Sequence, residues 1–136
     1  MKAVYIDASA VVKLVIDEPE HGDLEAYLLK QWLYVSSIVT KVEVRRAVAR
    51  AQNPLDRTVD IRVDRVLTTL ELMAIDSTVI QFAGGAQPIS LRSLDAIHLG
   101  TALCLGGDLE AFITYDRKLG AAASASGLRV VTPGYE

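Results

Sequence analysis

The chain has 136 residues, of which 51% are hydrophobic and 6% aromatic, and its formal net charge is −3. This length suffices for one domain over residues 1–136 whose core needs no disulfide or structural metal, and the apolar content excludes a disordered chain. The acidic balance argues against a general nucleic-acid binder, and the scarcity of aromatic residues argues against a stacking platform for single strands.

The first strand is predicted at Val4-Tyr5-Ile6, because this run lacks polar alternation, as in a strand buried on both faces of a parallel sheet. The run ends at Asp7. Ser9 is predicted to cap the helix that starts at Ala10. A carboxylate at the carboxyl end of a central strand lies where open α/β sheets bind ligands. The alternative is that Asp7 only helps to cap the helix.

Strand and helix patterns alternate along the rest of the chain. Helices are predicted over residues 20–31, 38–52, 55–70, 77–82, 91–105 and 117–126, and strands over residues 32–36, 71–76, 111–116 and 128–131. Ser36 or Ser37 is available to cap the second of these helices. The alternation predicts an α/β fold in which helices cover both faces of a parallel sheet.

Positive charge is concentrated in one segment of this acidic chain. Seven of the 14 lysines and arginines lie between residues 41 and 65, against four acidic residues, which gives the segment a local charge of +3. Three interpretations are open: contact with an RNA backbone, pairing with an acidic partner protein, or solvation of two helices.

Four acidic residues stand at points of the predicted elements where they can meet. Asp7 and Asp116 are predicted to end strands. Asp95 lies in the first turn of a predicted helix, and Glu43 lies inside another. Right-handed crossovers bring strand ends of one polarity to one edge of a sheet. The four carboxylates are therefore expected to converge although they are distant in sequence.

Converging carboxylates repel one another and raise one another's pKa values. A hard divalent cation such as Mg²⁺ or Mn²⁺ removes this conflict, and the lack of a Cys or His cluster argues against zinc. Such an ion keeps several waters, completes its shell with substrate phosphates, and lowers the pKa of a bound water for phosphodiester hydrolysis.

Each acid also has a purely structural interpretation. Asp95 suits the positive end of a helix dipole, and Asp116 suits an N-cap. Glu43 shares a helix face with Arg46 and Arg50, which is also typical of a solvated face carrying ion pairs. The four acids together favour the metal site.

Four segments carry a resemblance to a known family. They are Ile6–Leu14, Thr40–Ala47, Arg92–Leu99 and Ile113–Leu119. In this order, and over nearly the whole chain, they resemble the PIN-domain ribonucleases, specifically VapC-type toxins of toxin–antitoxin pairs. The resemblance implies a five-stranded parallel sheet flanked by helices and an endoribonuclease that depends on Mg²⁺ or Mn²⁺. It also implies a homodimer and a cognate antitoxin that lies over the acidic groove.

The resemblance also assigns roles to individual residues. Mapped by motif, the catalytic acids are Asp7, Glu43, Asp95 and Asp116, all but Glu43 being metal ligands. Ser9 and Thr114 match polar positions beside the acids and are candidate substrate-binding residues. Arg92 precedes the helix of Asp95 and is either a phosphate contact or a plain surface arginine. The family often has an acidic or amide residue before the last Asp, where this chain has Tyr115, so the resemblance does not define the shell of a second ion.

His98 lies one helical turn after Asp95, but its apolar neighbours favour a packed histidine over an acid–base group. A single cysteine, Cys104, lies in an apolar stretch. No secretion signal or membrane-spanning run is recognisable, so a cytoplasmic protein with no membrane partner is expected.

Two other functions compete with the nuclease. A catalytically inactive PIN-like module that only binds RNA or protein is disfavoured because all four acids are present. A phospho-receiver domain requires an acidic pair beside the first strand and a lysine ending the last. Here Asp7 is flanked by Ile6 and Ala8, and the last strand carries Arg129.

Overall fold

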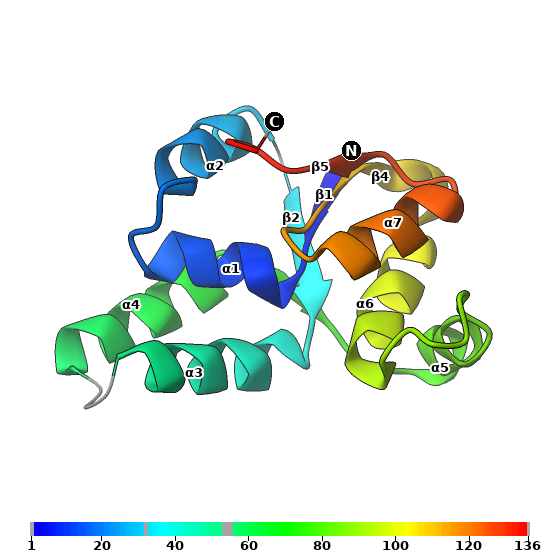
Figure 1. The fold of residues 1–136 in the computed structure, drawn as a ribbon, viewed down its shortest axis with the longest axis horizontal. Helices are drawn as coiled ribbons and strands as arrows, with labels where there is room; N and C mark the ends of the chain where they lie inside the picture. The colour runs from blue at the N-terminus through cyan, green and yellow to red at the C-terminus, as the bar shows by residue number, and fades with distance from the viewer. Residues whose placement is uncertain (1, 32, 53–55, 136) are drawn as a thin grey trace.

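A computed structural model describes residues 2–31, 33–52 and 56–135. Its centre is one sheet of five parallel strands in the order β3-β2-β1-β4-β5 (Figure 1). The strands are β1 (Ala3–Ile6), β2 (Leu33–Ser37), β3 (Glu71–Met73), β4 (Leu109–Ile113) and β5 (Val130–Val131). The predicted five-stranded parallel sheet is confirmed. The predicted start of the second strand at Trp32 lies outside the described residues.

Seven α-helices and one short 3₁₀ turn (Gly106–Asp108) connect the strands in the described part of the chain. The helices are α1 (Ala8–Val15), α2 (His21–Leu28), α3 (Thr40–Ala51), α4 (Arg57–Thr68), α5 (Ser77–Gly84), α6 (Ser93–Leu103) and α7 (Arg117–Ala125). The predicted start of the fourth helix at Leu55 is outside the described residues. None of the helices that the structure describes is long and apolar enough to cross a membrane.

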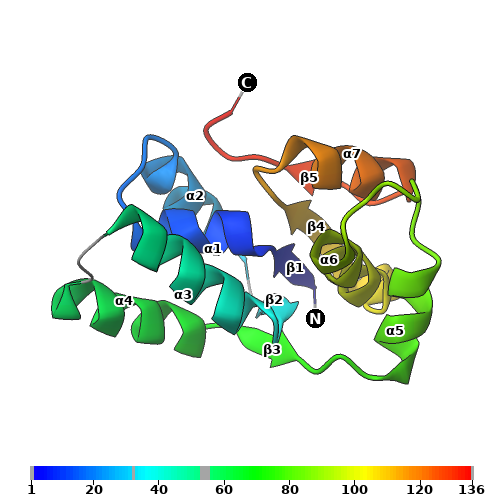
Figure 2. The ribbon, with the colours of Figure 1, turned by 60° about the horizontal axis from the view of Figure 1, so that its bottom comes forward.

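Helices cover both faces of the sheet, as the alternating pattern predicts. In Figure 2, α1 to α4 lie on one side of the strands and α5 to α7 on the other. Successive side chains of a strand point to opposite faces. Val4 and Ile6 accordingly pack into the core with α1 to α4, whereas Tyr5 packs with α6 and α7. All four residues of β1 are buried, so this strand is the centre of the molecule.

The carboxyl ends of the central strands meet at one edge of the sheet. Ile6 of β1 is in register with Ile113 of β4, and the backbone N–H of Asp7 continues the ladder by donating to the Ile113 carbonyl at 3.1 Å. Because both strands run in the same direction, Asp7 and Thr114 leave the sheet side by side. This edge is where the polar residues of the chain collect.

Several predicted bounds and caps differ from the structure, and two of these errors concern the polar edge of the sheet. The N-cap of α1 is Asp7, not Ser9: the helix starts at Ala8, and the Asp7 carboxylate accepts the Ala10 N–H at 3.0 Å. Strand β4 ends at Ile113 rather than at residue 116, so Asp116 ends no strand. It is instead the N-cap of α7.

Candidate active site

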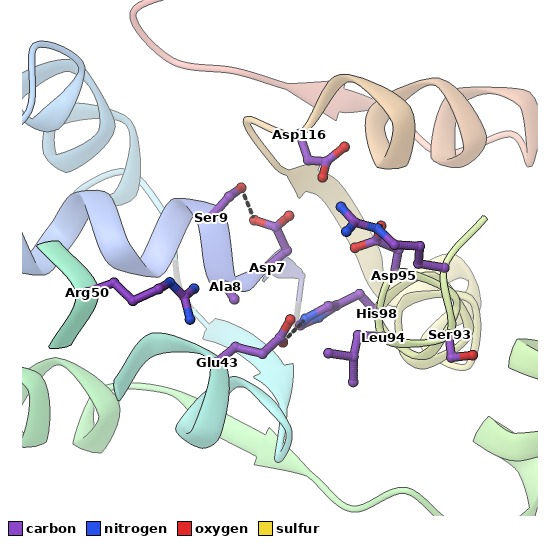
Figure 3. A pocket seen from close by; sticks show the side chains of 11 residues that line it. Asp7, Ala8, Ser9, Glu43, Arg50, Ser93, Leu94, Asp95, His98 and Asp116 are labelled. Atoms are coloured by element: carbon purple, nitrogen blue, oxygen red, sulfur yellow. Dashed lines mark hydrogen bonds and ion pairs between the residues drawn. The ribbon is translucent and has the colours of Figure 1, made fainter. Parts of the chain in front are cut away.

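The four predicted acids line a single pocket of about 430 Å³ at the carboxyl edge of the sheet. Each comes from a different part of the chain: Asp7 from the β1–α1 junction, Glu43 from α3, Asp95 from α6 and Asp116 from the β4–α7 junction. Figure 3 shows their carboxylates around the same space. The sequence therefore predicted correctly which acids meet.

Asp7 is the most deeply placed of these acids, with an exposed fraction of 3%. One carboxylate oxygen accepts hydrogen bonds from the Ser9 hydroxyl at 2.7 Å and the Ala10 N–H at 3.0 Å, and the other accepts the Thr114 hydroxyl at 2.5 Å. Burial raises the pKa of Asp7, and the nearby His98 and the hydrogen bonds oppose this rise. A cation bound beside such a buried carboxylate would stabilise its ionised form.

The hydroxyls of Ser9 and Thr114 tie Asp7 to the turn after β4. The Ser9 oxygen accepts the Tyr115 N–H at 2.9 Å, and the Thr114 oxygen accepts the Asp116 N–H at 3.0 Å. Ser9 lines the pocket, as a substrate-binding residue would. Thr114 is 1% exposed and lies behind Asp7, so the structure gives it a supporting position rather than one open to substrate.

Asp95 and Asp116 face the pocket from helix ends. Burial raises the pKa of Asp95, and the negative charge of Asp116 raises it further. Asp116 also caps α7 by accepting the Leu119 N–H at 3.0 Å, so it combines the structural role with a place in the pocket. Arg92 lines the pocket too, with its Nε 4.0 Å from Asp95 Oδ2 and its side chain 82% exposed. It is free to reach a bound phosphate.

Glu43 is held by a buried histidine. His98 Nε2 lies 2.6 Å from Glu43 Oε1, and His98 Nδ1 lies 2.6 Å from the Tyr5 hydroxyl. His98 is 1% exposed, which confirms the packed histidine that its neighbours indicated. Its connection to Glu43 was not predicted from the sequence. The available signal was a tyrosine in the middle of an otherwise aliphatic buried strand, since a buried Tyr hydroxyl usually finds a partner.

The basic segment is divided between two roles. Arg50 lines the acidic pocket beside Glu43, and with Arg45 and Arg46 it also forms a shallow neighbouring hollow on α3. Arg45 makes ion pairs with Asp60, at 3.3 Å, and with Asp64 of α4. The interpretation as a solvated pair of helices therefore holds for Arg45, whereas Arg50 presents a cation at the pocket.

The pocket fits a hard divalent cation by the chemistry of its donors. Its acidic side chains offer carboxylate oxygens to an ion. Both nitrogens of its one imidazole, that of His98, are already hydrogen-bonded within the protein. Within the described residues, no group of three or more His, Cys, Asp or Glu side chains is arranged so that it could hold a metal ion. It is the donor type, carboxylate oxygen, that suits Mg²⁺ or Mn²⁺, whose shells are completed by water and phosphate oxygens, better than zinc.

Comparison with known proteins agrees with this fold. The sequence model of the PIN domain matches residues 4–125, so the chain belongs to the PIN-domain family. Two curated relatives come from Mycobacterium tuberculosis. Ribonuclease VapC46 is 42% identical over 98% of this chain and 99% of its own, and ribonuclease VapC47 is 36% identical over 96% and 97%. The resemblance to VapC-type toxins is thereby confirmed.

Solved structures show the same fold at low sequence identity. The crystal structure of M. tuberculosis VapC20, described as a toxin that cleaves the sarcin–ricin loop, superimposes with a TM-score of 0.72 at 15% identity, over 96% of this chain and 99% of that one. VapBC2 from Rickettsia felis, bound to a DNA fragment from its promoter, gives a TM-score of 0.69 at 12% identity, over 96% and 98%.

Proposed function

We propose that the protein is an endoribonuclease that uses Mg²⁺ or Mn²⁺ to hydrolyse RNA phosphodiester bonds. We further propose that it is the toxin of a type II toxin–antitoxin pair, neutralised by a cognate VapB-like antitoxin. The observation that carries the proposal is the convergence of four carboxylates in one pocket of a chain whose near-full-length relatives are named ribonucleases. The similarity to the VapBC2 structure supports the antitoxin.

In this proposal Asp7, Asp95 and Asp116 hold the metal ion. When bound, the ion lowers the pKa of a coordinated water and stabilises negative charge on the leaving oxygen. Burial raises the pKa values of Asp7 and Asp95, and the charge of Asp116 adds to the rise at Asp95, so a bound cation would favour the ionised form of both carboxyl groups. Ser9 and Thr114 keep the Asp7 carboxylate in one orientation by donating to its two oxygens.

The remaining pocket residues act on the RNA. Glu43 lies on the wall formed by α3, where its carboxylate accepts a proton from, or orients, the attacking water. Arg50 and Arg92 line the same pocket and pair with phosphates that flank the cleaved bond. A homodimer and a cytoplasmic location remain predictions from the sequence.

The test is cleavage of a panel of structured and single-stranded RNAs in EDTA, in Mg²⁺ and in Mn²⁺. Wild-type protein is compared with Asp7→Asn and with Asp17→Asn, a matched control because Asp17 is exposed. We expect metal-dependent cleavage by wild type and Asp17→Asn, and none by folded Asp7→Asn. Cleavage in EDTA, or wild-type rates in Asp7→Asn, would contradict the proposal. RNA binding without cleavage in either metal would favour the inactive module instead.

A further inference from the structure

A continuous chain of three side chains crosses the interior and ends at the acidic pocket. It starts at the Tyr5 hydroxyl on β1, passes through both nitrogens of the His98 ring on α6, and ends at the Glu43 carboxylate on α3, with 2.6 Å at each junction. Tyr5 and His98 are 0% and 1% exposed, whereas the Glu43 side chain is 21% exposed. These hydrogen-bonded side chains thus connect the core to a single group, the Glu43 carboxylate, that solvent and substrate can reach.

The two buried rings have little freedom to move. Tyr5 stacks on Phe112, with ring centroids 5.1 Å apart and an interplanar angle of 4°. The His98 ring meets the Tyr5 ring edge-on at 5.8 Å and 75°. Packing therefore fixes the place of the imidazole before any substrate binds.

The three side chains are arranged to donate hydrogen bonds in one direction. The Tyr5 hydroxyl is fully buried, and its oxygen lies 2.6 Å from His98 Nδ1. The hydroxyls of Ser36 and Thr101 donate to the carbonyls of Ile6 and Ile97. An ionised Glu43 carboxylate only accepts, so His98 Nε2 carries the hydrogen between them. When the imidazole is neutral, its Nδ1 has no hydrogen and accepts one from the Tyr5 hydroxyl.

The hydrogen bond between His98 and Glu43 joins the two helical layers at the pocket. Glu43 belongs to α3 and His98 to α6, and these helices lie on opposite sides of the strands (Figure 2). In the described part of the chain His98 is the one protein group within hydrogen-bonding distance of the Glu43 carboxylate. Figure 3 shows the His98 ring meeting the Glu43 carboxylate across a dashed line, with both side chains at the pocket.

We propose that His98 is a positioning residue that fixes the Glu43 carboxylate through Nε2–H, and that Tyr5 holds the imidazole in place by its hydrogen bond to Nδ1. The inference rests on the proposed nuclease function. His98 does not act on the RNA itself, because both ring nitrogens are used inside the protein. Tyr5 and His98 instead hold Glu43 in the orientation in which it meets the attacking water, as groups behind a reactive residue do elsewhere.

Two substitutions at one position separate positioning from packing. In His98→Gln the amide nitrogen takes the place of Nε2 and still donates to Glu43, while in His98→Asn it takes the place of Nδ1 and does not reach. We expect His98→Asn to lower kcat about 10-fold or more with KM nearly unchanged, and His98→Gln to recover most of the loss. Equal kcat in two folded variants, or losses that follow their melting temperatures, would overturn the proposal.

A measurement on metal-free protein tests the same bond without catalysis. Imidazole ¹⁵N NMR is expected to show a protonated Nε2 on His98 whose hydrogen exchanges slowly, and the signal should shift in Glu43→Ala. In Tyr5→Phe, which retains a ring to stack on Phe112, the Nδ1 signal should shift while Nε2 stays protonated. An unprotonated Nε2 in the wild type would overturn the inference. If wild-type protein cuts no RNA, the nuclease proposal fails while the NMR result still decides whether His98 holds Glu43.

Discussion

Replacing Thr114 by valine tests how strongly the fold supports Asp7. The change keeps the shape of the side chain but removes a hydroxyl that donates to the Asp7 carboxylate at 2.5 Å and accepts the Asp116 N–H at 3.0 Å. Thr114 is 1% exposed, so water does not replace these bonds easily. A hydrogen bond to a charged group and a backbone N–H left without a partner together cost about 2–4 kcal/mol of unfolding free energy.

The penalty of Thr114→Val should depend on pH. The Thr114 hydroxyl lowers the pKa of Asp7, which burial raises, so the variant has a still higher pKa in the folded state. A carboxyl group whose folded pKa lies above its unfolded value destabilises the fold when ionised, and this loss disappears as pH falls through the folded pKa towards the unfolded one. The penalty is therefore largest at neutral pH and shrinks in acid.

Urea unfolding in EDTA, at neutral pH and in mild acid, measures this difference. Thr114→Ser is the matched control, because it keeps the hydroxyl and loses only a methyl group, at about 0.5–1.5 kcal/mol. A Thr114→Val penalty no larger than that of Thr114→Ser, or one that does not change with pH, would refute the reasoning about Asp7.

Three further predictions concern packing, RNA binding and metal binding. Gly100→Ala should destabilise the protein by about 1–3 kcal/mol in thermal unfolding, because its Cβ would lie 2.8 Å from a backbone nitrogen of α5, whereas Gly22→Ala, with nothing within 4 Å, should not. Arg50→Ala should reduce the slope of log RNA affinity against log salt concentration by about one. Arg45→Ala should reduce this slope by less, because the Arg45 guanidinium already pairs with α4. Equal effects of the two substitutions would place the RNA elsewhere. Because the pKa of Asp95 is raised, protons should compete with Mn²⁺, so calorimetric affinity should fall as pH drops into the carboxyl range, and a flat profile would contradict this.

The sheet could be predicted because each strand is marked locally. Val4-Tyr5-Ile6 reads as a buried strand without reference to the rest of the chain, and it is one. The end of β4 could not be predicted in this way. Thr114 and Tyr115 look like a continuation of the strand, but Thr114 and the Tyr115 N–H bond to Asp7 and Ser9, more than 100 residues earlier in the chain. These long-range bonds stop the ladder at Ile113.

The same distinction applies to the site. The identities of the four acids followed from their places at the ends and first turns of elements, together with a family resemblance over most of the chain. Asp7 and Ser9 are both good N-cap residues, so local pattern alone did not decide which of them caps α1. The bonds of His98 join residues 55 and 93 positions away, and no local pattern reveals such pairs. Sequence therefore indicated the reactive groups better than the side chains that hold them.

The most direct test of the account is RNA cleavage in H₂¹⁸O with Mn²⁺, followed by mass analysis of the fragment ends. Attack by water in the acidic pocket predicts a terminal phosphate that carries one ¹⁸O, formed by wild type and not by Asp7→Asn. A 2′,3′-cyclic phosphate without ¹⁸O, formed equally well in EDTA, would contradict metal-dependent hydrolysis and assign the attack to the ribose hydroxyl.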